Sequence, residues 1–317
     1  MPRFTPCSCL VALVLALGGP LSAQQPGPVL SIDRGLQAGL ETLTREFHGE
    51  VGIYVRQLRT GRGAAIRADE VFPTASMIKV PILATLYDRI DRGELHFDSM
   101  LVYTDSLIDP EESDLLGSFR DSARVELGRV IMLMLTMSDN TAALWNQSLA
   151  GTGTAINQWL VRNGFDSTRV NSRTPGREEA HRTYGWGQTT PREMAELLAR
   201  IREGRAVSPA ASQEMYRDLT RSYWNGEALS QLPPWVQAAS KQGAVDASRS
   251  EVVLVNAPSG DYVFCVITRN QQDRSWRHDN EGFVLLRRVS ALLWRHFEPA
   301  HLWAPAPGTE RFKPRDD

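Results

Sequence analysis

Hydrophobic positions near the start of the chain change from helical spacing to strand spacing. Apolar residues recur at helical spacing from Leu36 to Phe47, which predicts an amphipathic first helix. Residues 51–58 then alternate as a β-strand does, and the turn-forming stretch 60–63 leads into a second short strand. The N-terminal part therefore reads as a helix followed by two strands.

The middle and the end of the chain have different patterns. Residues 74–205 mostly follow a helical pattern that loops interrupt, whereas 251–257 and 261–268 read as two strands joined by a turn. A last helix is expected over residues 281–297. Strands at both ends with a helical insert predict an α/β fold, in which an antiparallel sheet is flanked by N- and C-terminal helices. An all-α lobe lies beside this sheet, with a cleft between the two.

These patterns also predict where the chain divides. We expect one catalytic domain over residues 24–303, with a sheet lobe from about 29–70 and 215–300 and an all-α lobe from about 71–214. The remaining residues, 304–317, are rich in proline and charge and are expected to form a flexible tail.

Residues 1–23 have the pattern of a secretory signal peptide. Arg3 precedes a short apolar run at residues 10–17, and small residues follow before Gln24. A membrane anchor is the weaker interpretation because the run is too short to span a bilayer. We therefore expect an exported protein, periplasmic or secreted, with no membrane anchor after processing.

Composition narrows the classes of partner. The 317 residues are 42% hydrophobic and 23% charged, which is typical of a globular protein with a sizeable core. A formal net charge of −2 gives no reason to expect a nucleic-acid or membrane-surface partner. The six histidines are scattered without metal-ligand spacing, so we expect no bound metal.

Ser76 and Lys79 form the first of three short motifs that can carry chemistry. Residues three apart on a helix share a face. A partly desolvated lysine there can accept the proton of a serine hydroxyl, which is otherwise a weak nucleophile. Taken alone, the pattern also fits a helix start with a solvated lysine.

The second and third motifs are equally ambiguous alone. Ser138-Asp-Asn140 follows an apolar helical run and fits either a helix end or a proton-shuttling hydroxyl beside a substrate-binding amide. Lys241-Gln-Gly243 precedes a strand-like segment. Its glycine would let a ligand approach the backbone closely, although an ordinary turn with an exposed lysine also fits.

In this order along the chain, the three motifs match the set found in class A β-lactamases and penicillin-binding proteins. The amino-acid sequences of residues 136–142 and 189–198 are also close to those of that family. The sequence therefore resembles the class A β-lactamase family over nearly the whole mature chain. The resemblance implies a monomeric serine hydrolase that needs no cofactor.

The resemblance implies catalytic roles for Ser76, Lys79 and Ser138. Ser76 would attack the substrate carbonyl and form an acyl-enzyme with help from Lys79, while Ser138 would pass a proton to the departing nitrogen. The backbone N–H groups of Ser76 and Ala244 would form the oxyanion hole. The positions implied to bind substrate are Asn140, Lys241, Gln242, Gly243, Ala244 and Arg249.

Two of these positions depart from the family pattern. Arg249, implied to pair with a substrate carboxylate, lies one residue short of the common spacing from Lys241. Gln242 stands where relatives usually carry Thr or Ser, so the carboxylate pocket is expected to be reshaped.

The largest departure concerns deacylation. The family activates the hydrolytic water with a loop glutamate, and this sequence places Thr174 at that position, Pro175 on the motif's proline and Glu178 where an asparagine belongs. A positioned base contributes a factor of about 10²–10⁴ to such a step, so the acyl-enzyme should persist without one.

Three interpretations follow from this departure. In the first, Glu178 acts as the replacement base and the protein is a working β-lactamase; a solvated loop carboxylate is an equally good account of Glu178. In the second, the substrate is an acyl-D-alanyl peptide or a related amide or ester. In the third, the protein binds or senses penicillins without turnover. The partner expected in each case is a small-molecule β-lactam or an acyl-D-alanyl peptide.

Overall fold

A six-stranded sheet joins the two ends of the chain in this computed structural model, which describes residues 28–107 and 114–314. The expected signal peptide lies outside these residues. The strand order is β1-β3-β2-β11-β10-β9, and β2 pairs antiparallel with β11 to connect the two halves. The strands are β1 (Ser31–Ile32), β2 (Glu50–Gln57), β3 (Arg62–Ile66), β9 (Ala238–Val245), β10 (Ser248–Val255) and β11 (Tyr262–Arg269).

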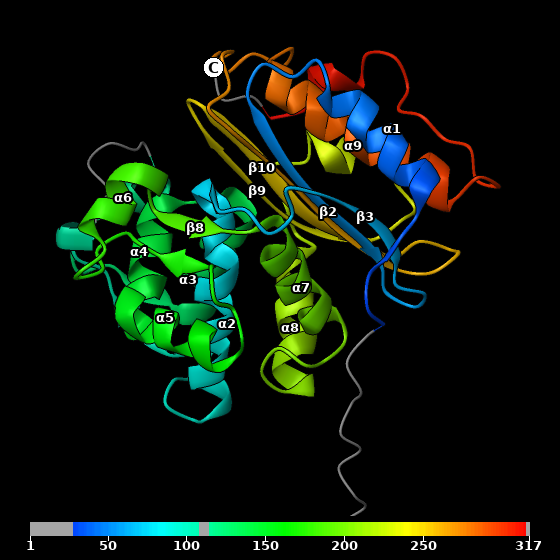
Figure 1. The fold of residues 1–317 in the computed structure, drawn as a ribbon. Coiled ribbons are helices and arrows are strands. Elements are labelled where there is room, and N and C mark those ends of the chain that lie inside the picture. The colour runs from blue at the N-terminus through cyan, green and yellow to red at the C-terminus, as the bar shows by residue number, and fades with distance from the viewer. Residues whose placement is uncertain (1–27, 108–113, 315–317) are drawn as a thin grey trace, which may run out of the picture.

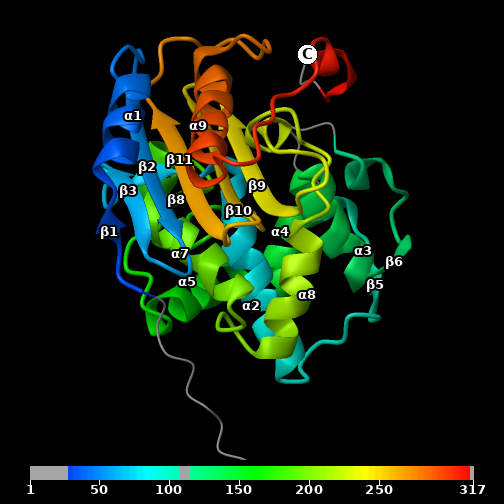
Figure 2. The same cartoon turned by 90° about the vertical axis from the view of Figure 1, so that its right-hand side faces the viewer.

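Helices cover both faces of this sheet because its strands carry apolar side chains on both sides. On β10, Val253 and Val255 pack into the core beneath α1 (Arg34–Thr44) and α9 (Glu281–Phe297), while Val252 and Leu254 pack into the core on the opposite face. Figure 2 shows α1 and α9 side by side over one face of the sheet. The expected α/β fold, with N- and C-terminal helices flanking an antiparallel sheet, is confirmed, although the two-residue edge strand β1 pairs parallel with β3.

The second lobe is built around α2 (Lys79–Asp91), a helix whose first nine residues are all buried. The other helices of this lobe lie to one side of the sheet (Figure 1). They are α3 (Leu127–Met132), α4 (Asn140–Leu149), α5 (Thr152–Arg162) and α6 (Glu178–Tyr184).

This lobe also contains two small antiparallel sheets that the sequence pattern did not predict, formed by strands of two or three residues. They are β4 (Phe72–Pro73), β8 (Gly187–Thr189) and β7 (Arg169–Val170), and β5 (Met100–Val102) with β6 (Arg124–Glu126).

Two further helices lie between the lobes. α7 (Pro191–Arg202) packs directly on β2, β10 and β11, and α8 (Pro209–Leu219) packs on α7, α2 and β9. The expected boundary of the helical lobe near residue 214 remains a prediction. No helix within the described ranges is long and apolar enough to cross a membrane.

Candidate active site

Ser76 lies in η1 (Ala75–Ile78), a turn of 3-10 helix that leads directly into α2. The residue before it, Ala75, has a φ of 44°. This value lies in the left-handed region of backbone conformation, which residues other than glycine rarely adopt. Such backbone strain persists only where the surrounding structure enforces it, and it is common at functional sites. The turn places Ser76 at the start of a helix buried in the second lobe.

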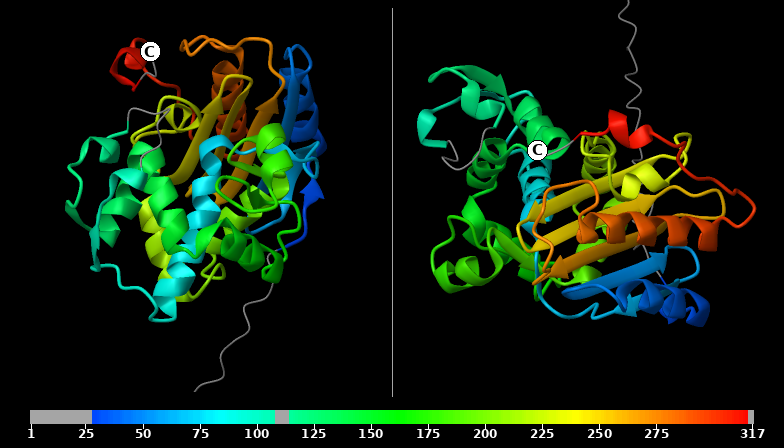
Figure 3. Two further views of the ribbon diagram at one scale, coloured as in Figure 1. Left: turned by 90° about the vertical axis from the view of Figure 1, so that its left-hand side faces the viewer. Right: turned by 90° about the horizontal axis from the view of Figure 1, so that it is seen from above.

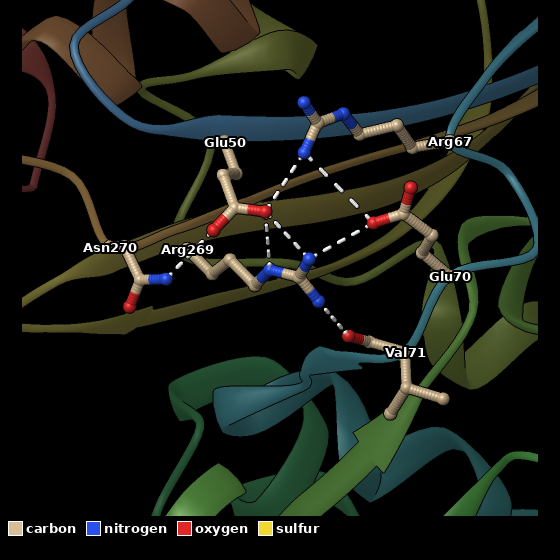
Figure 4. Close-up of polar contacts among 6 residues, drawn as sticks. All are labelled: Glu50, Arg67, Glu70, Val71, Arg269 and Asn270. Atoms are coloured by element: carbon tan, nitrogen blue, oxygen red, sulfur yellow. Dashed lines mark hydrogen bonds and ion pairs between the residues drawn. The ribbon is translucent and has the colours of Figure 1, made fainter.

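A network of ion pairs holds the segment that leads to Ser76 (Figure 4). Arg269 on β11 donates to the carboxylates of Glu50 at 2.6 Å and Glu70 at 2.9 Å, and also to the backbone carbonyl of Val71. Arg67 donates to Glu50 at 2.8 Å. The chain segment that precedes Ser76 is thereby attached to the central strands of the sheet.

Lys79 is fully buried, and its ammonium contacts Ser76, Asn140 and both the hydroxyl and the backbone carbonyl of Ser138. Its Nζ lies 3.0 Å from Ser76 Oγ, 3.0 Å from Ser138 Oγ and 2.6 Å from Asn140 Oδ1. The expectation from the Ser-x-x-Lys spacing, that both side chains share a face, agrees with this geometry. An amine within hydrogen-bond reach of a hydroxyl is the arrangement required to activate a serine.

Ser138 is presented by an unusual helix end. It follows a π-helical turn, Leu133–Met137, and has a φ of 61°. Insertions of this kind in α-helices are frequent at functional sites. Asp139 begins α4 as its N-cap, accepting the backbone N–H of Ala142 at 2.7 Å. The middle residue of the Ser-Asp-Asn motif therefore fixes the backbone that aims its two neighbours.

Lys241 reaches the same serine from the sheet. Its Nζ lies 2.9 Å from Ser138 Oγ, 2.8 Å from Gln242 Oε1 and 3.0 Å from the Gln242 carbonyl oxygen. Burial, reinforced by the charge of Lys79, holds the pKa of Lys241 well below its usual value. Two lysines from different lobes thus approach one hydroxyl.

Gly243 allows β9 to approach the nucleophile. A Cβ at this position would lie 2.6 Å from the carbonyl oxygen of Thr74 and 2.8 Å from the backbone nitrogen of Ser76. Ser250 on β10 donates to the same Thr74 carbonyl at 3.3 Å. The backbone around Ser76 is therefore in direct contact with β9 and β10.

These groups open onto a cleft of about 1070 Å³. Ser76, Ser138 and Asn140 line it from the helical lobe, and Gln242, Gly243 and Ala244 from the sheet. Clefts of this size accommodate a small organic molecule or a short peptide. Within the described parts of the chain, no group of three or more His, Cys, Asp or Glu is placed to hold a metal ion.

A family model described as "Beta-lactamase enzyme family" matches residues 35–297 of this chain. The chain belongs to the β-lactamase enzyme family. The resemblance expected from the sequence motifs is confirmed.

Individual relatives agree with this membership. The β-lactamase AER-1 of Aeromonas hydrophila is 26% identical over 263 residues, which cover 82% of this chain and 86% of that protein. The solved structure of PBP-A is 26% identical with a TM-score of 0.77, and the match covers 86% of this chain and 100% of PBP-A. A β-lactamase from Sphaerobacter thermophilus, 22% identical over 83% of this chain and 97% of its own, shares the fold with a TM-score of 0.73.

Arg249, implied by the family resemblance to bind a carboxylate, does not line the cleft. It is fully buried, and its guanidinium donates to the carbonyl oxygens of Ser248 at 3.0 Å and Ser275 at 2.7 Å. It also lies 4.5 Å from the centre of the Trp276 ring. Its guanidinium thus holds the loop before α9 against the sheet.

Thr174, at the position of the family's deacylating glutamate, also faces away from the cleft. Its hydroxyl donates to the carbonyl of Ser172 at 2.8 Å. The side chain packs so closely on Gly153 of α5 that a Cβ there would lie 1.8 Å from Thr174 Oγ1. The side chain at this position is therefore held inside the helical lobe.

Glu178, the expected replacement base, is exposed at the start of α6 and is absent from the described lining of the cleft. Its carboxylate accepts the backbone N–H of Gly176 at 3.0 Å. Hydrogen bonds from its own N–H and from Gly176 lower the pKa of this carboxyl. A lowered pKa makes the carboxylate a weaker proton acceptor.

Sequence patterns missed several residues of the site. Ser250 lines the cleft, as do Trp224 and Trp276. Trp235, by contrast, packs against Trp294 with ring centroids 5.8 Å apart. No periodicity in the sequence distinguishes a tryptophan that lines the cleft from one that packs elsewhere, because the outcome depends on which loop crosses the cleft.

Proposed function

We propose that this member of the β-lactamase family forms an acyl-enzyme at Ser76 and that its substrates are β-lactams. The observation that carries the proposal is the convergence of Lys79 and Lys241 on Ser138, with Ser76 Oγ 3.0 Å from Lys79 Nζ. A relative supports it: a point mutant of PBP-A has been solved as an acyl-enzyme complex with penicillin G. Export, as expected from residues 1–23, is part of the proposal.

Acylation follows from the positions of the proton-carrying groups. Lys79 accepts the proton of Ser76 Oγ, which bonds to the lactam carbonyl carbon as the C–N bond breaks. Ser138 passes its proton to the departing nitrogen and is reprotonated from the lysines beside it. The backbone N–H groups of Ser76 and Ala244 stabilise the oxyanion.

Substrate is held by the groups that line the cleft. Asn140 contacts the amide side of the substrate together with Lys79. The amide oxygen of Gln242 accepts from Lys241, so its amide NH₂ is the part that donates to the substrate. The amide NH₂ of Gln242 is a neutral donor for a carbonyl or carboxylate oxygen of the substrate.

Deacylation is the slow step in this proposal. Thr174 is held against α5, and Glu178 is exposed and hydrogen-bonded to its own helix start. Without a base beside the ester, hydrolysis is expected to be slower by a factor of about 10²–10⁴. The same slow step favours acyl-D-alanyl peptides as an alternative substrate class. A persistent acyl-enzyme can transfer its acyl group to an acceptor other than water.

The deciding experiment is intact-protein mass spectrometry of the chain mixed with penicillin G and followed over time. We expect an adduct of one penicillin that persists for hours and is absent from the Ser76→Ala variant. An adduct that decays within minutes while product accumulates would mean that another group activates the water. No adduct at all would refute acylation of this site by β-lactams.

The Glu178→Gln variant tests the replacement base in the same assay. Because Glu178 is exposed and outside the cleft lining, we expect the adduct to form and decay as in the unmodified chain. Slower decay in this variant alone would assign water activation to Glu178.

A further inference from the structure

The chain does not end where α9 ends. Residues 298–314, here called the C-terminal strap, turn back after Phe297 and run beside α9 toward the helical lobe (Figure 3). The strap is held near its start, where Trp294 Nε1 donates to the carbonyl of His301 at 2.8 Å. Pro305 and Pro307 restrict its backbone, which lowers the entropy lost on ordering it. The flexible tail expected over residues 304–317 remains a prediction.

The far end of the strap contacts the loop that precedes β9. After the 3-10 turn η6 (Thr309–Phe312), Lys313 Nζ donates to Asn225 Oδ1 at 3.1 Å. A Cβ on Gly226 would lie 3.5 Å from Lys313 Cβ, an ordinary packing distance. Partial burial lowers the pKa of Lys313, in keeping with this packing. Pro314 and Gly226 both line the active-site cleft.

This wall of the cleft is connected to the leaving-group side of the site. Trp224, next to Asn225, donates its Nε1 to the carbonyl of Met137 at 2.7 Å. Met137 directly precedes Ser138, the residue that passes a proton to the departing nitrogen in the proposed function. The strap, the 224–226 loop and Ser138 are therefore successive neighbours.

We propose that the C-terminal strap is a specificity element that limits the size of the leaving-group side of the substrate. Pro314 forms part of the cleft lining on this side. Lys313 holds Pro314 in place through its hydrogen bond to Asn225. The proposal rests on the proposed acylation of Ser76. A bulky group attached beyond the departing atom would meet the strap, whereas the acyl group would not. Displacing the strap requires loss of its contacts, so substrates with large leaving groups acylate Ser76 more slowly.

The test compares two esters that share a phenylacetylglycyl acyl group. One carries glycolate as its leaving group and the other carries the much larger 3-(4-biphenylyl)lactate. We measure kcat/KM of acylation for both esters in the full chain and in a chain that ends at Trp303. In the shortened chain the ratio of large to small ester should rise about tenfold, in the range that steric exclusion from a pocket supplies. A chain that ends at Pro314 is the matched control and should keep the ratio of the full chain.

Two point variants keep the proposal testable if the shortened chain does not fold. Lys313→Ala removes the bond to Asn225 and should move the ratio in the same direction by a smaller factor. Pro314→Trp adds bulk to the wall and should move the ratio the opposite way. An unchanged ratio in all variants that are acylated would overturn the strap as a specificity element. Absence of acylation by both esters and by penicillin G in every chain would instead refute the proposed function.

Discussion

At the residue scale, the site is organised by two buried lysines that share Ser138 Oγ. Lys79 Nζ lies 3.0 Å from this oxygen and Lys241 Nζ lies 2.9 Å from it. Burial is the main cause that disfavours the charged form of Lys241, and the nearby charge of Lys79 adds to it. The lowered pKa of Lys241 reflects this arrangement. A lowered pKa makes the Lys241 ammonium easier to deprotonate.

Replacing Gly243 with alanine should abolish most acylation. The added Cβ would lie within 2.8 Å of Ser76 N and 2.6 Å of Thr74 O, and backbone atoms cannot move away cheaply. Displacing an oxyanion donor costs about 10²-fold or more in rate, which is the loss expected for the rate of adduct formation. Gly35→Ala, where the nearest atom would lie 3.5 Å away, is the control and should acylate normally. A Gly243→Ala chain that acylates at the original rate would show that the close approach of β9 is dispensable.

At the element scale, α7 joins the helical lobe to the sheet through one carboxylate. Glu196 accepts from Arg56 Nε at 2.9 Å and Nη2 at 2.8 Å, and from Tyr54 OH at 2.6 Å. Arg56 and Tyr54 are neighbours on one face of β2 and are almost fully buried. The bidentate geometry fixes how α7 lies on the sheet, and therefore how the two lobes frame the cleft.

Removing this carboxylate should destabilise the whole protein. In Glu196→Ala, Arg56 would keep a buried charge without its partner, which costs about 3 kcal/mol of unfolding free energy. Glu214→Ala on α8 removes an exposed pair with Arg217 and should cost less than about 1 kcal/mol. Urea unfolding of the two variants, followed by circular dichroism, measures the difference. Equal effects would mean that α7 is held by its apolar face alone.

At the scale of the whole molecule, the sheet separates two cores, and a buried carboxyl lies at the edge of one of them. Glu251 on β10 accepts from Ser240 Oγ at 2.7 Å and from the backbone N–H of Ala228 at 2.8 Å. Its hydrogen bonds link the strands to the turn η5 (Ala228–Gln231), which packs on α9. Burial raises the pKa of Glu251 to about 7.

This raised pKa predicts how the stability of the fold depends on pH. The carboxyl has a pKa of 4.5 as its ordinary value, so the folded protein holds its proton more tightly than the unfolded chain. Stability from this group is therefore fully present below pH 4.5 and is lost as pH rises from there to about 7. The shift corresponds to a loss of about 3 kcal/mol at most.

Glu251→Gln isolates this effect because the amide does not titrate, its oxygen can accept from the backbone N–H of Ala228 and its NH₂ can donate to Ser240 Oγ. Relative to the original chain, the variant should gain unfolding free energy between pH 4 and pH 8, measured by urea unfolding at each pH. A difference between the two chains that does not change with pH would mean that Glu251 titrates normally in the folded state.

The amino-acid sequence by itself determined the N- and C-terminal helices, the hairpin of the sheet and the three motifs. Helical spacing placed the last helix over 281–297, and two apolar runs on either side of a turn placed the hairpin of β10 and β11, because these patterns depend only on neighbours along the chain. Ser76 and Lys79 were likewise predictable, since residues three apart on a helix share a face.

Only the tertiary structure decided what lines the cleft. Arg249 turns to the carbonyl of Ser275, Thr174 packs on Gly153, and Pro314 returns from the end of the chain to the cleft. Each outcome depends on which distant backbone lies beside the residue, and no periodicity within a segment carries that information. The sequence therefore determined the chemical groups of the site, while the packing of distant segments decided which of them can reach a substrate.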